Sequence, residues 1–243
     1  MEINLEEFQT LLSQLTSFDK MYEQVRFVDP VKKEVLFVKH KNQEEIIPVL
    51  EPCFGIWGEI DIWINNAGQN TTRMFSWETD GTCTENIIKT NLIGMIYGSQ
   101  IAATGMLKQG HGAIYSMEGL GSNNMVQPKT ILYGTTKHAL TYFMRGLAKE
   151  LEGTNVIAGR LSPGMVLTDF ITKTPDGKRS EVFSDEKFRK TFNILADKPE
   201  TVAKYFVPRI LKNLKNDAQI AWLTNRKAAW RFMTAGFRKD RLI

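Results

Sequence analysis

The sequence has few of the residues that hold together small secreted folds or metal sites. Its 243 residues include two cysteines, Cys53 and Cys83, and three histidines. Two cysteines are too few for a disulfide framework or a zinc site. The histidines, His40, His111 and His138, are not spaced as metal ligands are. We therefore expect no metal centre and a reducing compartment, the cytoplasm.

The chain also lacks long apolar runs and a strong excess of one charge. Its longest run without a charged residue, 90–107, contains Asn91, Ser99 and Gln100, which favours a buried helix over a membrane span. No basic and apolar leader precedes a small-residue cleavage site, so we expect no secretion. The net charge is +4, yet six Lys or Arg against one Asp give residues 225–243 a charge of +5. The rest of the chain therefore carries −1, which argues against nucleic-acid binding.

Apolar runs and helical periodicities alternate through most of the chain. Four short apolar runs predict buried strands, at 60–64, 113–117, 156–161 and 220–223. Three stretches between or after them predict helices, at 82–108, 130–152 and 199–215. Such alternation predicts βαβ units, so the expected fold class is α/β, with a Rossmann-like parallel sheet and flanking helices over residues 43–243.

The first 42 residues have a different pattern. Leu and Phe recur at helical spacing over 5–15, and two β-rich runs, 24–28 and 33–38, flank the turn-forming pair Asp29-Pro30. This pattern predicts one helix and a β-hairpin, which would form an unrelated N-terminal cap. The alternative is a segment that resembles the start of bacterial sensor regions before diguanylate cyclase domains.

Tyr133 and Lys137 form the sharpest motif, because residues four apart share a face of the helix expected at 130–152. A free tyrosine has a pKa of about 10 and is a poor acid or base near neutrality, but a nearby cation lowers that pKa. Such a pair can exchange a proton with a carbonyl or an alcohol. From this motif alone, a surface tyrosine over a lysine stem stays open.

Small and polar residues follow two of the predicted strands. Asn-Asn-Ala-Gly at 65–68 and Pro-Gly-x-x-x-Thr at 163–168 would let the backbone approach a ligand at the carboxyl end of a strand. Asn91 lies in an otherwise apolar helix, where an unpaired amide is costly to bury. We therefore expect each of these three features to contact either a bound ligand or a polar group elsewhere in the fold.

Together these motifs resemble the short-chain dehydrogenase/reductase family. Asn-Asn-Ala-Gly, the helical Asn91, Tyr133-x-x-x-Lys137 and Pro-Gly-x-x-x-Thr occur in the family's order and spacing. The resemblance covers about residues 43–243. Three segments are most similar to the chlorophyll b reductase branch and its bacterial relatives, at 58–68, 162–168 and 192–203.

The resemblance implies a reductase that moves hydride between NAD(P)(H) and a small-molecule carbonyl/alcohol substrate, with the cofactor preference open. Tyr133 would be the proton donor or acceptor, Lys137 would hold the nicotinamide ribose and lower the Tyr133 pKa, and Asn91 would keep a water-linked proton path. The implied cofactor-binding residues are Asn65, Asn66, Ala67, Gly68, Lys137, Pro163, Gly164, Val166 and Thr168. The family also implies a homo-oligomer paired through the helices 82–108 and 130–152.

Two features depart from the family pattern. Where the family has a serine before the tyrosine, this chain has Gly119; Ser122 is the first candidate for the missing hydroxyl and Ser116 the second, with a structural loop serine an equal alternative. The family also opens with a strand and a glycine-rich loop that receives the cofactor pyrophosphate. Residues 1–64 contain only Gly55 and Gly58, so we expect the N-terminal strands to be lost and replaced by the helix and hairpin.

The missing loop leaves two alternatives to an active reductase. One is a catalytically impaired remnant that acts as a scaffold or binding module, and the other is a sensor-linked regulatory protein.

The basic C-terminus predicts an amphipathic helix at 226–237. Trp230, Met233 and Phe237 cluster on one face, with Arg231 to the side of it. We expect this apolar face to pack on its own domain or on a second subunit. Association with a membrane surface is the less favoured alternative.

Overall fold

The computed structural model describes residues 36–37, 59–70, 73–174, 178, 180–237 and 242–243. Five strands form one parallel sheet in chain order: β1 (Leu36–Phe37), β2 (Ile62–Asn65), β3 (Gly112–Met117), β4 (Val156–Ser162) and β5 (Ala218–Ala221). The predicted α/β class and parallel sheet are confirmed.

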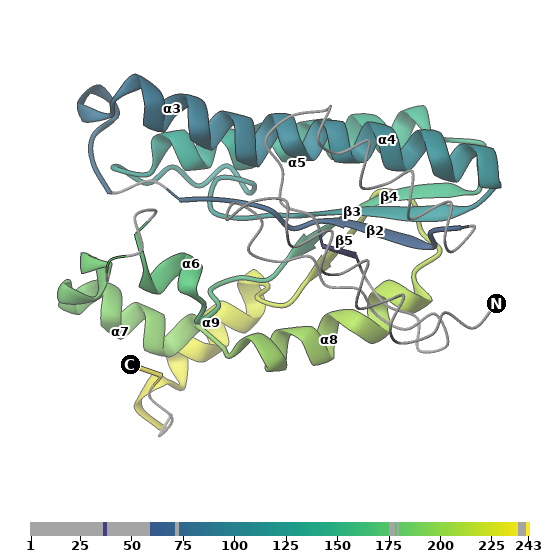
Figure 1. Cartoon of the computed structure of the whole chain (residues 1–243). Coiled ribbons are helices and arrows are strands. Elements are labelled where there is room, and N and C mark those ends of the chain that lie inside the picture. Colours follow the sequence, from purple (N-terminus) through teal and green to yellow (C-terminus); the bar gives the residue numbers. More distant parts are fainter. Residues whose placement is uncertain (1–35, 38–58, 71–72, 175–177, 179, 238–241) are drawn as a thin grey trace, which may run out of the picture.

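Helices cover both faces of the sheet (Figure 1). One layer contains α3 (Gly81–Ile88), a π-helix (Lys89–Ile93), α4 (Gly94–Gln109) and α5 (Ile131–Glu150). The other contains α6 (Asp169–Thr172), α7 (Glu186–Leu195), α8 (Pro199–Lys212) and α9 (Asn225–Met233). Short 3-10 turns complete the described part, at Ser76–Glu78, Glu181–Ser184 and Ala235–Phe237. None of the helices in this part is long and apolar enough to cross a membrane.

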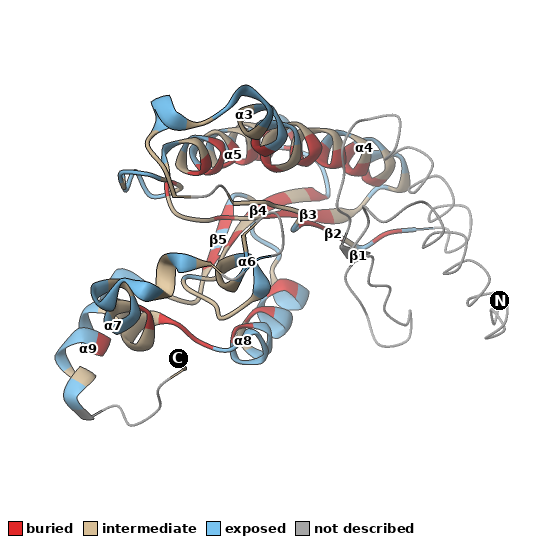
Figure 2. Cartoon of the chain, turned by 60° about the vertical axis from the view of Figure 1, so that its left-hand side comes forward, coloured by how far each residue is buried: buried red, intermediate tan, exposed pale blue. Residues whose placement is uncertain are grey.

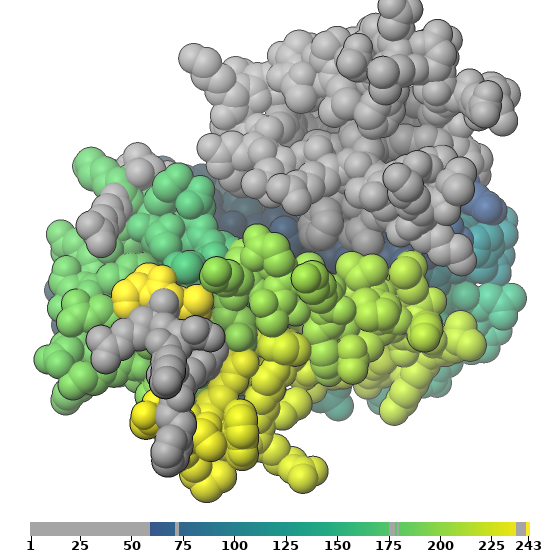
Figure 3. All heavy atoms as spheres, turned by 90° about the horizontal axis from the view of Figure 1, so that it is seen from below, coloured from purple at the N-terminus to yellow at the C-terminus, as the bar shows by residue number. Residues whose placement is uncertain are grey.

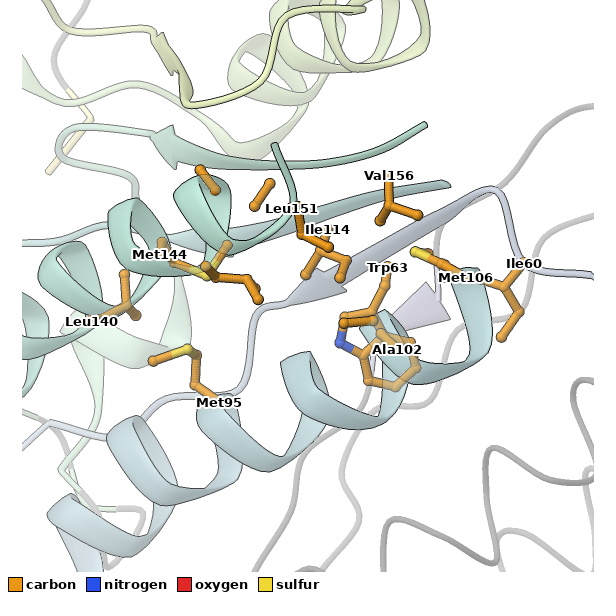
Figure 4. Close-up of a cluster of buried hydrophobic side chains, with 14 residues drawn as sticks. Ile60, Trp63, Met95, Ala102, Met106, Ile114, Leu140, Met144, Leu151 and Val156 are labelled. Atoms are coloured by element: carbon orange, nitrogen blue, oxygen red, sulfur yellow. The ribbon is translucent and has the colours of Figure 1, made fainter. Parts of the chain in front are cut away.

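Two cores fill the spaces between the layers. Figure 2 shows the buried side of α4 and α5 turned toward the sheet, and Figure 4 shows Trp63, Met106 and Ile114 in the cluster between them. Each such side chain, when fully buried, stabilises the fold by about 1.5–3 kcal/mol. A second core, which includes Tyr115 and Phe206, joins the other face of the sheet to α8. Both faces of the strands are therefore buried, which explains their nearly continuous apolar runs.

β1 lies at the N-terminal edge of the sheet and pairs in parallel with β2, Leu36 opposite Trp63 and Phe37 opposite Ile64. It falls within the run 33–38, which we expected to pair in a hairpin with 24–28. The proposed partner 24–28 and the helix 5–15 lie outside the described residues. Membership of β1 in the parallel sheet is thus a feature that the sequence pattern did not indicate.

α9 docks on the domain through Arg231 and leaves the predicted apolar face exposed. Trp230 is 60% and Met233 74% exposed, whereas Arg231 is buried. Arg231 Nη1 lies 2.7 Å from Asp197 Oδ2 and also donates to the Leu195 carbonyl. The expectation that Trp230 and Met233 pack on their own domain is therefore wrong, because a buried carboxylate beside α9 draws in the arginine instead. Figure 3 shows α8 and α9 side by side on the outer face.

Candidate active site

The predicted motifs meet at one edge of the sheet because the strands are parallel and in register. Asn65 pairs with Ser116 and Met117 pairs with Leu161, so β2, β3 and β4 end side by side. Their following loops leave from the same edge, where ligands of open α/β sheets bind.

Tyr133 and Lys137 lie on the first turns of α5, and both side chains are buried. The Lys137 Nζ lies 5.8 Å from the centroid of the Tyr133 ring and donates a 2.9 Å hydrogen bond to the Met117 carbonyl. α5 thus brings an ammonium and a phenol together over the end of β3.

Burial shifts the pKa of these two groups in opposite directions. It lowers the pKa of Lys137 to about 8, although the negative charge of Glu118 opposes the shift. It raises the pKa of Tyr133, because the phenolate would lose its hydration. The lower Tyr133 pKa that the family resemblance implies is therefore not found in the chain alone, where loss of hydration dominates.

Gly119 is the second residue after β3 and lies against the Tyr133 hydroxyl. A Cβ added at Gly119 would overlap the Tyr133 Oη and lie 3.2 Å from the Lys137 Cγ. The space that a serine side chain would need is therefore taken by the phenol itself.

The two candidate serines point elsewhere. Ser122 Oγ accepts from the Gly119 amide at 3.2 Å and donates to the Lys137 carbonyl at 3.1 Å, so it braces the loop against α5. Ser116 is fully buried and contacts the sulfur of Met144. Both hydroxyls therefore make structural contacts, and neither is bonded to Tyr133, so a catalytic role of Ser122 stays a prediction.

Asn91 lies in the π-helix between α3 and α4, a local widening that is frequent at functional sites. Its Oδ1 accepts from the Gln69 amide at 2.7 Å, and its Nδ2 donates to the Gln69 carbonyl and to Thr136 Oγ1. The buried amide thereby ties the loop after β2 to α5. Next to it, a Cβ on Gly68 would lie 3.6 Å from Asn91 Oδ1 and 3.9 Å from Lys137 Nζ, so Gly68 belongs to the same site.

Asn65 does not face this site. Its Oδ1 accepts from Trp63 Nε1 at 2.8 Å, and its Nδ2 donates to Ser99 Oγ and Ser116 Oγ. Its side chain is hydrogen-bonded within the core, and the predicted contact of Asn65 with the cofactor stays a prediction. Asn66 is exposed, and Ala67 is half-buried, so these two positions of the loop remain open to a ligand.

The segment 163–168 follows directly on β4. Asp197 holds it in place, with a parallel bridge to Val166 and backbone hydrogen bonds to Met165 and Leu167. Gly164 has φ of +72°, a conformation that favours glycine. Pro163, Val166 and Thr168 are half-buried and Gly164 is exposed.

The structure adds two residues that the sequence analysis missed. Phe170, on α6, has its ring centroid 5.7 Å from that of Tyr133, and it lies two residues after the predicted segment 163–168. Glu118 is a buried carboxylate at the end of β3, beside the residues that contact Lys137 and Tyr133. A carboxylate that ends a buried apolar run was the feature that could have indicated it.

One exposed cluster lies at the opposite edge of the sheet. Asp61 precedes β2 and His111 precedes β3, and the His111 Nε2 is 3.5 Å from Asp61 and 3.8 Å from Glu59. The sequence pattern suggested an isolated His111. The structure instead places it beside two carboxylates, at the opposite edge of the sheet from Tyr133 and Lys137.

Known proteins are similar over most of the chain. The family described as short chain dehydrogenase matches residues 11–179, and so begins upstream of residue 43. A probable chlorophyll(ide) b reductase of Arabidopsis thaliana chloroplasts is 35% identical over 185 residues, which are 76% of this chain and 36% of that protein. A second chloroplastic chlorophyll(ide) b reductase of Arabidopsis thaliana is 32% identical over 197 residues, 76% of this chain and 54% of that protein.

The chain thus spans about a third to a half of the length of these relatives. Among solved structures, a serine dehydrogenase complexed with NADP⁺ is 26% identical with a TM-score of 0.65, over 76% of this chain and 73% of that one.

Proposed function

The chain belongs to the short chain dehydrogenase family, and on this premise we propose that it is an oxidoreductase that transfers hydride between NAD(P)(H) and a carbonyl/alcohol substrate. The observation that carries the proposal is the buried pair of Tyr133 and Lys137 at the carboxyl ends of the strands. A phenol beside an ammonium is suited to exchange a proton with a carbonyl oxygen.

The described residues fit the nicotinamide-ribose end of such a cofactor. Lys137 has three protons to donate, and its one hydrogen bond through Nζ to the described residues goes to Met117. The Tyr133 hydroxyl makes none with them. The remaining protons of Lys137 and the Tyr133 hydroxyl are therefore available to a ligand, and two ribose hydroxyls and a substrate oxygen would pair with them. The pyrophosphate end would be held mainly by residues before β2, most of which lie outside the described ranges.

When bound, the cofactor supplies or accepts the hydride. In the direction of reduction, Tyr133 donates its proton to the oxygen that becomes an alcohol. The raised pKa of Tyr133 keeps that proton in place before reaction. The charge of Lys137 then stabilises the phenolate left behind, and Phe170 shields one side of Tyr133 from water.

We propose a large, apolar carbonyl compound as the substrate class. Support comes from the two relatives named as chlorophyll(ide) b reductases and from exposed apolar side chains, which are Met125 and Val126 on the loop after β3 and Phe170 on α6. We further propose that the protein is cytoplasmic. We also propose that it forms a homo-oligomer paired through α4 and α5, and light scattering would measure its mass in solution.

The test is a cofactor titration followed by turnover. Nicotinamide fluorescence with NADH and NADPH measures binding, and cofactor oxidation with chlorophyllide b and a set of apolar aldehydes measures reduction. Tyr133→Phe should bind cofactor as the parent does and lose about 10²–10⁴ of the rate. Tyr142→Phe, an exposed tyrosine on the same helix, is the matched control and should keep it. Equal measurable rates for the parent and Tyr133→Phe would refute the role of Tyr133, and no turnover by the parent would favour the scaffold alternative.

A further inference from the structure

Glu118 is a buried carboxylate that the proposed chemistry does not yet use. It is 4% exposed, and its Oε2 accepts a 2.6 Å hydrogen bond from Gln219 Nε2 on β5. Its Oε1 lies 3.6 Å from Arg160 Nη1 on β4 and has no hydrogen-bond partner among the described residues. A carboxylate so removed from water, with one oxygen incompletely paired, is costly to the fold.

Glu118 lies between two residues that contact the proton-transfer pair, Lys137 and Tyr133. The preceding residue, Met117, offers its carbonyl to Lys137 Nζ, and the following residue, Gly119, contacts the Tyr133 hydroxyl. The Glu118 amide donates to the Leu161 carbonyl at 2.8 Å, which fixes this turn of backbone to β4. One residue therefore lies between the two backbone contacts of the proton-transfer pair.

Charged groups approach Glu118 from two elements. Lys137 comes from α5, and Arg160 comes from β4. Arg160 has a second carboxylate partner, because its Nη2 lies 2.8 Å from Asp217 Oδ1. Arg160 therefore pairs with two carboxylates, and of these Glu118 is the one whose charge acts on Lys137.

We propose that Glu118 is a positioning residue that keeps the Lys137 ammonium charged in its buried site and aligns the end of β3 beneath Tyr133. The inference rests on the proposed function for its catalytic meaning. Its physical content, a charge interaction between Glu118 and Lys137, does not depend on catalysis. Burial lowers the pKa of Lys137 to about 8 even with Glu118 present, so without the carboxylate a larger fraction of Lys137 would be neutral near neutrality.

The first test is the NMR titration of Lys137 in the cofactor-free chain with isotopically labelled lysine, its resonance assigned by its loss in Lys137→Arg. Glu118→Gln keeps the shape of the side chain and can still accept from Gln219. We expect its Lys137 midpoint to fall by about one pH unit, the smaller end of what a nearby opposite charge produces. An unchanged midpoint would overturn the proposal, whether or not the chain is an enzyme.

Asp217→Asn is the matched control. It removes a carboxylate from the same Arg160 guanidinium, and asparagine tolerates the left-handed backbone at this position, where φ is 53°. We expect the Lys137 midpoint to stay in place, and an equal fall in both variants would refute a specific role of Glu118. Glu118→Asp retains the charge, so its Lys137 midpoint should lie closer to that of the parent than to that of Glu118→Gln.

Two further measurements keep the proposal testable if Glu118→Gln does not fold. In the parent chain, Lys137 should titrate well above the range of about pH 5–6 found for buried lysines without support, and a midpoint in that range contradicts the proposal. With cofactor and substrate, the alkaline limb of kcat/KM should follow the Lys137 midpoint of each folded variant. A limb that stays fixed while the midpoint moves would show that Glu118 affects Lys137 without serving turnover.

Discussion

Replacing Gly119 with alanine tests the contact at the centre of the proposed site. An added Cβ would overlap the Tyr133 Oη and lie 3.1 Å from its Cζ and 3.2 Å from the Lys137 Cγ. An ordinary separation of ~3.5 Å requires the hydroxyl to retreat by about 1 Å. Overpacking of this kind costs ~1–3 kcal/mol of stability, and a 1 Å displacement of a reacting group costs about 10²-fold in rate. We therefore expect a folded variant with a rate reduced by about 10²-fold.

The assay compares kcat/KM for carbonyl reduction with the free energy of unfolding from denaturant titration. Gly134→Ala is the matched control, because a Cβ there meets its nearest neighbours at 3.8 Å and 3.9 Å, which is ordinary contact. Alanine in that helix should leave the rate unchanged and stabilise the chain by up to about 1 kcal/mol. Gly119→Ala with the rate of the parent would refute the placement of Tyr133 against Gly119. Gly119→Ser, although it restores the family's residue, should be impaired in the same way.

Three further predictions concern stability. Lys137 has a pKa of about 8 in the folded chain and 10.5 as an unperturbed group, so the unfolded state binds more protons between these values. Its contribution to the free energy of unfolding should therefore rise from about pH 8 to pH 10, and denaturant titrations of Lys137→Met should lack that rise. Asn91→Ala leaves the backbone of the loop after β2 unpaired and should cost about 2 kcal/mol or more by the same method, while a smaller loss would mean that water replaces the amide. Arg231→Met should cost about 3 kcal/mol by removing the charge partner of the buried Asp197, although Trp222 Nε1 still donates to that carboxylate, whereas Trp230→Ala should stay within about 0.5 kcal/mol in a dilute monomer. A loss for Trp230→Ala that grows with protein concentration would show that a second subunit covers this residue.

The sequence was sufficient to predict the strands β2 to β5 and the edge of the sheet at which the motifs meet, but not β1. Strands buried on both faces must be apolar throughout, so apolar runs indicate them. β2, β3 and β4 overlap the apolar runs at 60–64, 113–117 and 156–161, respectively. The parallel arrangement follows from the helices between them, since parallel strands need long crossovers. Motifs that come directly after such strands must meet at one edge, and Tyr133, Lys137, Asn91 and Gly68 do lie together.

The same sequence could not decide which polar partner each side chain finds across elements. Asn65 ends an apolar strand just as a ligand-binding amide would, yet its side chain is hydrogen-bonded in the core to Trp63, Ser99 and Ser116. Periodicity in α9 identified an apolar face, but Asp197, from a distant part of the chain, makes the arginine face the buried one.

The contacts of Glu118 and Gly119 at the proposed active site also depend on the tertiary structure. Their residue types and their position after β3 follow from the sequence alone, because a buried strand ends there. What each of them does depends on α5, whose Tyr133 fills the space beside Gly119 and whose Lys137 comes under the charge of Glu118. Local patterns determine which segments are buried and where they end, since burial depends on periodicity along one element. Hydrogen bonds and charge pairs between elements depend on distances of a few ångströms across the fold, and only the tertiary structure sets those.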